Sequence, residues 1–183
     1  MNSEIASWTL FRYSENMNVV LRAFKEVDAP FLLYLYGTTR EDELSHTNFT
    51  AQEKDDFIRQ QFNAQHDTYA LCYPKARGDL IVLEQQNIGR LYVDRREQEI
   101  RVMGIALLPE WRNKGVGTQL MNELLREATE KNHPVTLHVE QNNPGAFAWY
   151  QRLGFAALWS NETHVFMIYP EGATAPAQPV CSV

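Results

Sequence analysis

The stretch "LLPEWRNKGVGTQLMNELLREA", residues 107–128, holds the sharpest change of pattern in the chain. An apolar run typical of a strand stops at Pro109, and the basic residues Arg112 and Lys114 then lead into Gly-Val-Gly. Beyond this turn, apolar residues recur every four positions, which is a helical period. These residues are Val116, Leu120, Leu124 and Ala128. The stretch therefore predicts a strand, a basic glycine turn and an amphipathic helix.

The glycine turn has the properties of an anion cradle. The start of a helix exposes unpaired N–H groups and carries roughly half a positive charge. Gly115 and Gly117 let that backbone approach an anion without a Cβ in the way, and Arg112 and Lys114 add positive charge beside it. The same letters also fit a plain turn whose basic side chains face solvent, so the turn alone leaves both interpretations open.

Two nucleotide motifs are excluded by the order of residues. A P-loop needs Lys after its second Gly, followed by Ser or Thr, whereas Lys114 precedes both glycines. The dinucleotide fingerprint needs a third Gly, and Leu120 stands at that position.

Composition predicts one globular, soluble domain. The 183 residues are 44% hydrophobic and 22% charged, and the net charge of −6 argues against a nucleic-acid partner. Mild acidity is weakly in favour of a cationic or amine-bearing partner. No apolar run is long enough to span a membrane, and no signal-peptide pattern opens the chain. Cys72 and Cys181 show no disulfide or zinc spacing, so we expect a cytoplasmic protein without a metal site.

Patterns along the chain predict a mixed α/β (α+β) fold. We expect an N-terminal extension over residues 1–16, a single domain over 17–169 and a disordered tail over 170–183. Within the domain the expected order is a strand, two helices, three strands, a helix, a strand, a helix and a strand. The first helix should close at Gly37, and Thr50 with Glu53 forms a capping box for the second. The amide-rich part of this second helix, with Gln60, Gln61, Gln65 and His66, is expected to face solvent, and the alternative is that it lines the acceptor side.

A second motif follows the glycine turn, after the predicted helix and a short strand. The segment "NNPGAFAWYQRLGF" reads as a helix with Asn143 as N-cap, Pro144 in the first turn and Gly154 at the exit. Together, the pattern Arg112-x-x-Gly115-x-Gly117 after a strand and this second segment resemble the GNAT superfamily of acyl-CoA-dependent N-acyltransferases. The matching residues of the second segment are Asn143, Ala146, Tyr150, Gly154 and Phe155.

The resemblance implies a mostly antiparallel sheet flanked by helices, with splayed central strands. It also implies acetyl-CoA as acyl donor, with pantetheine between the strand ending at Leu107 and the strand Val135–Glu140. The backbone around Ile105, Ala106 and Leu107 would hold pantetheine, and Asn143 and Tyr150 would face it. The implied pyrophosphate site comprises Arg112, Asn113, Lys114, Gly115, Val116, Gly117 and Thr118.

Acetyl transfer to an amine needs a base, and the chain offers two candidates. Glu99 resembles the catalytic glutamate position of histone acetyltransferases in this superfamily. His138 resembles the base position of ribosomal-protein N-terminal acetyltransferases, and an imidazole titrating near pH 6.5 suits proton transfer at neutral pH. Both residues also have plain structural interpretations, and bulk water is a third alternative.

Tyr150 is the candidate acid for the leaving thiolate, although its ring also fits a packing role. The resulting hypothesis is an enzyme that acetylates a primary amine by direct attack through a tetrahedral intermediate. The acceptor is a small-molecule amine or a protein amino group, and the protein is a monomer or a homodimer. The alternative is a non-catalytic acyl-CoA-binding module.

Overall fold

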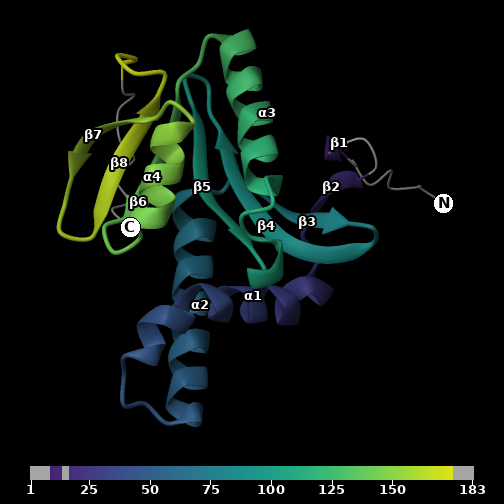
Figure 1. Ribbon diagram of the computed structural model, residues 1–183, viewed down its shortest axis with the longest axis vertical. Helices are drawn as coiled ribbons and strands as arrows, with labels where there is room; N and C mark the ends of the chain where they lie inside the picture. Colours follow the sequence, from purple (N-terminus) through teal and green to yellow (C-terminus); the bar gives the residue numbers. More distant parts are fainter. Residues whose placement is uncertain (1–8, 14–16, 175–183) are drawn as a thin grey trace.

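The computed structural model describes residues 9–13 and 17–174 and builds them around one eight-stranded sheet (Figure 1). The strands lie in the order β1-β2-β3-β4-β5-β6-β8-β7, and every neighbouring pair is antiparallel except β5 and β6. The strands are β1 (Thr9–Tyr13), β2 (Met17–Ala23), β3 (Arg77–Leu83), β4 (Gln86–Arg95), β5 (Ile100–Leu107), β6 (Val135–Glu140), β7 (Ala156–Ser160) and β8 (His164–Tyr169). The expected mixed, mostly antiparallel sheet is confirmed.

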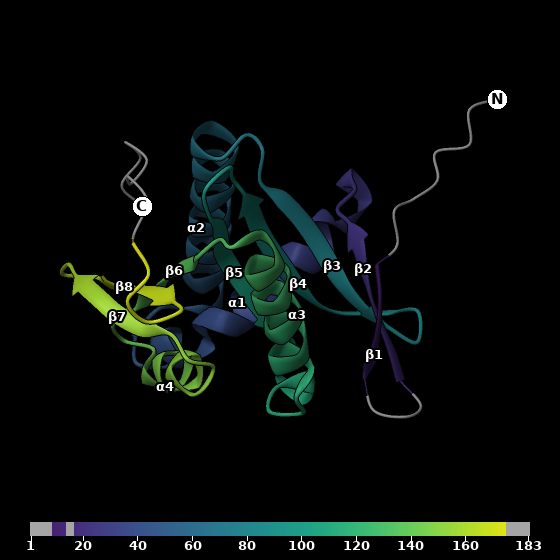
Figure 2. The ribbon, with the colours of Figure 1, turned by 90° about the horizontal axis from the view of Figure 1, so that it is seen from above.

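Four α-helices flank this sheet: α1 (Ala29–Ser45), α2 (Ala51–Cys72), α3 (Val116–Lys131) and α4 (Pro144–Arg152). Two short 3-10 turns, Glu26–Asp28 and Pro109–Trp111, precede α1 and α3. Figure 2 shows α2 on one face of the sheet and α3 with α4 on the opposite face.

Strand alternation supplies a separate apolar cluster to each face. In β3, Leu80 and Val82 pack with Leu32 of α1 and Phe62 of α2. The other face holds the larger cluster, to which β3 contributes Ile81 and Leu83. All four apolar residues predicted to line one side of α3 are buried: Val116, Leu120, Leu124 and Ala128.

Strands β5 and β6 separate after a short parallel ladder. Their register runs only from Ile100 opposite Val135 to Val102 opposite Leu137, although β5 continues to Leu107. At this point β5 carries a bulge, since Val102 and Gly104 pair with consecutive residues of β4 and Met103 between them pairs with none. A bulge bends its strand and increases its twist, which turns the rest of β5 away from β6. The expected splay of the central strands is therefore present.

Several local predictions hold at the ends of the helices. Thr50 and Glu53 form the predicted capping box at the start of α2. Asn143 caps α4 by accepting a hydrogen bond from the Ala146 amide at 3.0 Å. Gly154 follows that helix with φ of +93°, a conformation that glycine adopts without steric cost.

Three expectations about secondary structure differ from the structure. Gly37 does not end the first helix, because α1 continues to Ser45 and Gly37 lies against Ile58 of α2. Strand β1 lies within residues 1–16, which were expected to form an extension, and pairs with β2. Strand β7 was not predicted. The part of the expected tail from residue 175 onward lies outside the described residues.

The expectation of no disulfide is wrong for Cys72, which is disulfide-bonded; Cys181 lies outside the described residues. The absence of disulfide spacing therefore no longer supports the expectation of a cytoplasmic protein, which stays a prediction. None of the described helices has the length and apolar character needed to cross a bilayer.

Candidate active site

A pocket of about 460 Å³ opens where β5 and β6 separate, and we call it the β5–β6 pocket. Its floor is formed by β4, β5 and β6, and its walls by α1, α2, α4 and β8. It is lined by Tyr36, Thr39, Arg40, Gln61, Ala64, Gln65, Thr68, Tyr69, Tyr73, Arg90, Arg101, Val102, Met103, Gly104, Ile105, Ala106, His138, Val139, Glu140, Asn143, Ala146, Tyr150 and His164. Five of the residues expected at the site thus line one cavity: Ile105, Ala106, His138, Asn143 and Tyr150.

The backbone of β5 presents alternate residues to this opening. A Cβ built on Gly89 of β4 would collide with the carbonyl oxygen of Ala106, so the peptide groups of Ala106 face β4. Because successive residues of a strand face opposite ways, the backbone groups of Ile105 and Leu107 face away from β4, toward the gap left by β6. This is the orientation that the resemblance implied for pantetheine binding.

The glycine turn begins α3 beside this gap. Gly115 is the N-cap residue with φ of +87°, and Asn113 also has positive φ, at +59°. In this part of the described chain, none of the amides from Asn113 to Thr118 donates to another backbone carbonyl. The helix start thus presents N–H groups without a backbone partner to an anion, although Val116 itself is buried.

Arg112 is not an isolated cation beside the turn. Its Nε donates to the Leu107 carbonyl oxygen at 2.9 Å, and its Nη2 donates to the carbonyl and hydroxyl oxygens of Thr38 at 3.1 and 2.9 Å. Arg112 therefore joins the end of β5 to α1. Lys114 is exposed, and its Nζ lies 4.9 Å from the ring centre of Trp111.

The second glycine of the turn has a packing role as well. A Cβ on Gly117 would lie 3.2 Å from Cζ2 of Trp149, an indole of α4. Nε1 of Trp149 donates to the Thr118 hydroxyl at 3.0 Å. The start of α3 and the middle of α4 are thus held in direct contact.

Tyr150 is one of the residues that line the pocket. It is 7% exposed, and its ring packs against Trp149 and Phe155 with centroid separations of 4.8 and 5.6 Å. Burial raises the pKa of the Tyr150 hydroxyl well above its usual value of 10. The phenol is therefore protonated at neutral pH, and burial makes it a weaker acid than a free tyrosine.

His138 lies at the rim of the pocket among aromatic rings. Its ring centre is 5.0 Å from that of Phe166, 5.7 Å from Trp159 and 6.2 Å from His164. Desolvation, with the nearby charges of Arg101 and His164, lowers the pKa of His138 to about 4. The expected titration near 6.5 is thus replaced by an imidazole that is neutral across the physiological range.

Glu99 has surroundings unlike those of His138. It is 1% exposed and does not line the β5–β6 pocket. Its carboxylate accepts a hydrogen bond from the Thr136 hydroxyl at 2.6 Å and from Nη1 of Arg96 at 2.8 Å, and Nε of Arg101 lies at 3.7 Å. The structure thus places Glu99 in an internal ion-pair cluster and does not bring it to the other candidate residues.

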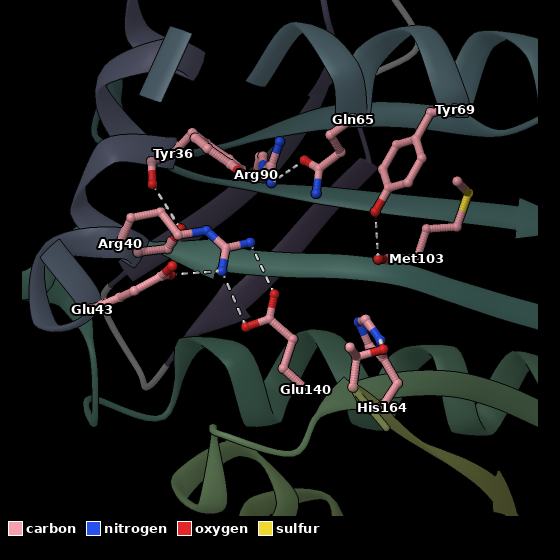
Figure 3. A network of polar contacts seen from close by, with 11 residues as sticks. Tyr36, Arg40, Glu43, Gln65, Tyr69, Arg90, Met103, Glu140 and His164 are labelled. Atoms are coloured by element: carbon pink, nitrogen blue, oxygen red, sulfur yellow. Dashed lines mark hydrogen bonds and ion pairs between the residues drawn. The ribbon is translucent and has the colours of Figure 1, made fainter. Parts of the chain in front are cut away.

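The pocket contains further polar residues, and of these sequence reasoning had considered only Gln61 and Gln65 of α2 (Figure 3). The Tyr69 hydroxyl donates to the Met103 carbonyl oxygen at 3.0 Å, so α2 is bonded to the bulge of β5. Arg40 of α1 forms two hydrogen bonds with the Glu140 carboxylate, at 2.9 and 3.2 Å. Nη2 of Arg90 donates to Oε1 of Gln65 at 2.9 Å.

One signal for Arg90 exists in the sequence, since a charged residue in the apolar strand "IGRLYVD" is unusual. The amide-rich part of α2 was expected to face solvent, yet Gln61 and Gln65 line the pocket. His66 and Gln60 are exposed, as expected, and do not line it.

Known structures share this fold at low sequence identity. An N-acetyltransferase, PaiA, of Thermoplasma acidophilum in complex with coenzyme A superposes with a TM-score of 0.63 at 15% identity, covering 82% of this chain and 97% of that one. An acetyltransferase of Thermus thermophilus gives 0.60 at 18% identity, covering 83% and 96%. The spermidine/spermine N-acetyltransferase SpeG of Vibrio cholerae gives 0.52 at 21% identity, covering 82% and 92%.

Comparison with curated proteins found no match. The model of the acetyltransferase (GNAT) family, in contrast, matches residues 38–155. This range includes the glycine turn, both separating strands and the Asn143–Phe155 segment. The chain therefore belongs to the acetyltransferase (GNAT) family.

Proposed function

We propose that the protein is an N-acetyltransferase that moves the acetyl group of acetyl-CoA to the primary amine of a small molecule. The observation that carries the proposal is the separation of β5 from β6 beside the unpaired amides that begin α3. Family membership and the coenzyme A complex of a protein with the same fold support the choice of donor.

The residues present fit the two ends of acetyl-CoA. The backbone groups of Ile105 and Leu107 face the gap and match the amides of an extended pantetheine arm, as an added strand would. The N–H groups from Asn113 to Thr118 match a pyrophosphate, and Lys114 adds a positive charge beside them. When bound, acetyl-CoA supplies an activated acetyl thioester.

The acceptor amine must lose a proton to attack. Free alkylamines of the lysine type have a pKa near 10.4, so most of the amine is protonated at neutral pH. His138 lines the pocket as a neutral imidazole and is the candidate acceptor of this proton, directly or through water. Its low basicity makes water the competing route.

Collapse of the tetrahedral intermediate returns a proton to sulfur. We assign Tyr150 as the donor, because its protonated hydroxyl belongs to the pocket lining. Backbone N–H groups of β5 that face the gap would stabilise the oxyanion. The C–N bond forms when the amine attacks, the C–S bond breaks when the intermediate collapses, and the proton lost by the amine is balanced by the proton gained by the thiolate.

The size of the pocket favours a small-molecule acceptor over a protein chain. Its volume of about 460 Å³ lies in the range of small-molecule sites. Helices α1 and α2 wall the acceptor side through Tyr36, Gln65 and Tyr69.

The test combines binding and turnover. Acetyl-CoA at 100 times its dissociation constant should stabilise the protein by about 2.7 kcal/mol, measured by thermal denaturation, whereas NAD and ATP should have no effect. Release of free thiol in the presence of an amine panel then measures transfer. Binding without thiol release from any amine would identify a non-catalytic acyl-CoA-binding module instead.

A further inference from the structure

We infer that the acceptor amine carries a carboxylate, which is held by Arg90 at the α1–α2 side of the β5–β6 pocket. This inference rests on the proposed function and adds the chemical class of the acceptor to it. It starts from Arg90, a cation of β4 that lines the pocket and is only 8% exposed.

Arg90 has no anionic partner in the described part of the chain. Its one hydrogen bond runs from Nη2 to the neutral amide of Gln65 at 2.9 Å, and its Nε is buried without a partner. The guanidinium also lies 5.8 Å from the ring centre of Tyr36 and 5.6 Å from that of Tyr92. Ring faces and an amide orient a cation, but they do not neutralise its charge.

The neighbouring arginine shows the contrast. Arg40 also lines the pocket, yet Glu140 binds it through two hydrogen bonds and Glu43 lies 3.4 Å away. Nε of Arg40 is also buried without a partner, but within the described residues Arg40 has carboxylates beside it and Arg90 has none. Buried charges are normally paired, because an unpaired ion loses its hydration without compensation. A ligand is the remaining source of the missing negative charge.

The charge of the pocket is opposite to that of the chain. Its lining contains three arginines and one carboxylate, in a chain whose net charge is −6. Glu99 lies 3.7 Å from Arg101 behind the lining, so Arg90 is the arginine of the lining without a carboxylate beside it in the described residues. Burial is the main cause that lowers the pKa of Arg90 and of His138, and the positive charges of Arg40 and Arg101 add to it, so a positive field acts on both groups. This field disfavours polycationic acceptors and favours a ligand with one negative charge.

The position of Arg90 suits an acceptor that has an amine and a carboxylate on one short skeleton. In the β4–β5 ladder Arg90 pairs with Ala106, next to Ile105, whose backbone faces the gap assigned to pantetheine. A planar guanidinium recognises a carboxylate through parallel N–H donors. The carboxylate would thus be fixed beside β4 while the amine points along the pocket toward the separating strands.

The experiment compares acceptors that differ only in the carboxylate. Thiol release from acetyl-CoA is measured with glycine, β-alanine and γ-aminobutyrate, with their carboxamides, and with putrescine and spermidine. For the best acid, kcat/KM should exceed that of its carboxamide by at least about tenfold, and the polyamines should be poorer still. The amine of a carboxamide is the less protonated one at neutral pH, so amine ionisation works against this result.

Variants then assign the preference to one side chain. Arg90→Gln should lower kcat/KM for the acid by about 10- to 100-fold and change that of the carboxamide by less than about threefold. Arg90→Lys keeps the charge without the planar donors and should restore part of the preference. Arg126→Gln removes the same charge from the exposed face of α3 and should leave the preference unchanged. Thermal denaturation with acetyl-CoA verifies that each variant is folded and binds the donor.

Each outcome of these experiments either supports or refutes a carboxylate-bearing acceptor. Better turnover of carboxamides or polyamines, or an equal loss for acid and carboxamide in Arg90→Gln, would overturn the inference while leaving acetyl transfer intact. If no amine is acetylated although acetyl-CoA binds, the CoA-saturated protein is titrated with N-acetyl-β-alanine and its carboxamide. Preferential binding of the acid that depends on Arg90 supports the inference, and its absence refutes it. Failure to bind acetyl-CoA at all refutes the proposed function as well.

Discussion

Val102 of β5 and Leu137 of β6 form the last pair in the parallel ladder between these strands. Both are buried in the core, at 2% and 1% exposure, so the sheet is closed up to this pair. Directly beyond it, Met103 bulges from the β4–β5 ladder and accepts the hydrogen bond of Tyr69. The opening of the sheet is therefore built into β5 and anchored by α2.

Replacement of Tyr150 by Phe tests its role as proton donor. The thiol of the leaving group has a pKa near 8.5, so its thiolate departs without much assistance. We expect kcat to fall by about tenfold, less than the roughly 10²–10⁴ of full general acid catalysis. The measurement is thiol release with a verified acceptor. Wild-type turnover in Tyr150→Phe would remove this residue from the chemistry.

Replacement of Glu99 by Gln should lower the stability of the protein and leave its catalytic rate unchanged. The carboxylate is buried with Thr136 and Arg96 as hydrogen-bond donors, and breaking a buried charge pair costs about 3–5 kcal/mol. We expect a marked drop in the urea midpoint and an unchanged kcat per folded molecule. Glu123→Gln, on the solvent-facing side of α3, is the control and should change stability by no more than about 0.5 kcal/mol. A folded Glu99→Gln protein without activity would restore Glu99 as the base.

His138 makes stability depend on pH in a defined window. Its pKa of about 4 in the folded state lies below the value near 6.5 of the unfolded chain. Between these values the unfolded state binds more protons, so the free energy of unfolding decreases as pH falls from about 6.5 to about 4. Denaturant titrations across this range should show a shallower decrease for His138→Gln than for wild type.

The control for this comparison is His66→Gln, which removes an exposed histidine of α2 outside the pocket. If the free energy of unfolding fell equally with pH in wild type and His138→Gln, the pKa of His138 would not be lowered in the folded state. His138 should contribute no inflection of kcat/KM between pH 6 and 7, because this residue titrates below that range.

Arg112 and Lys114 should separate a structural role from an electrostatic one. Arg112→Gln loses the bonds to Leu107 and Thr38, and we expect the free energy of unfolding to fall by about 1–2 kcal/mol. Lys114→Gln removes the same charge from the same turn without those bonds and should be destabilised less, by about 0.5–1 kcal/mol. Urea denaturation measures both variants. Equal stability of the two proteins would contradict the bridging role of Arg112.

Local chemistry made much of the fold predictable. The four-residue apolar period of α3, the Thr50–Glu53 capping box and the Asn143 cap depend on neighbouring residues, and all three are present. Gly37 was misjudged because tertiary packing against α2 outweighs the weak helix propensity of glycine. Strand β7 was missed because its residues are mostly exposed and show no alternating pattern.

The donor side of the site was more accessible to sequence reasoning than the acceptor side. The residues of the donor side lie in two continuous segments with recognisable spacing. The acceptor side combines Arg40 of α1, Gln65 of α2, Arg90 of β4 and Glu140 of β6, which no local pattern connects. Likewise, the sequence suggests that His138 titrates near pH 6.5. Its pKa is instead lowered by burial, which depends on side chains that are distant in sequence.

Residue-resolved amide hydrogen exchange with and without acetyl-CoA tests the central claim most directly. The account predicts strong protection on binding at two places, the amides of Ile105 and Leu107 in β5 and those from Asn113 to Thr118 at the start of α3. The amide of Ala106, which faces β4, should change little. Protection confined to other segments, or binding that leaves both places unprotected, would contradict the account.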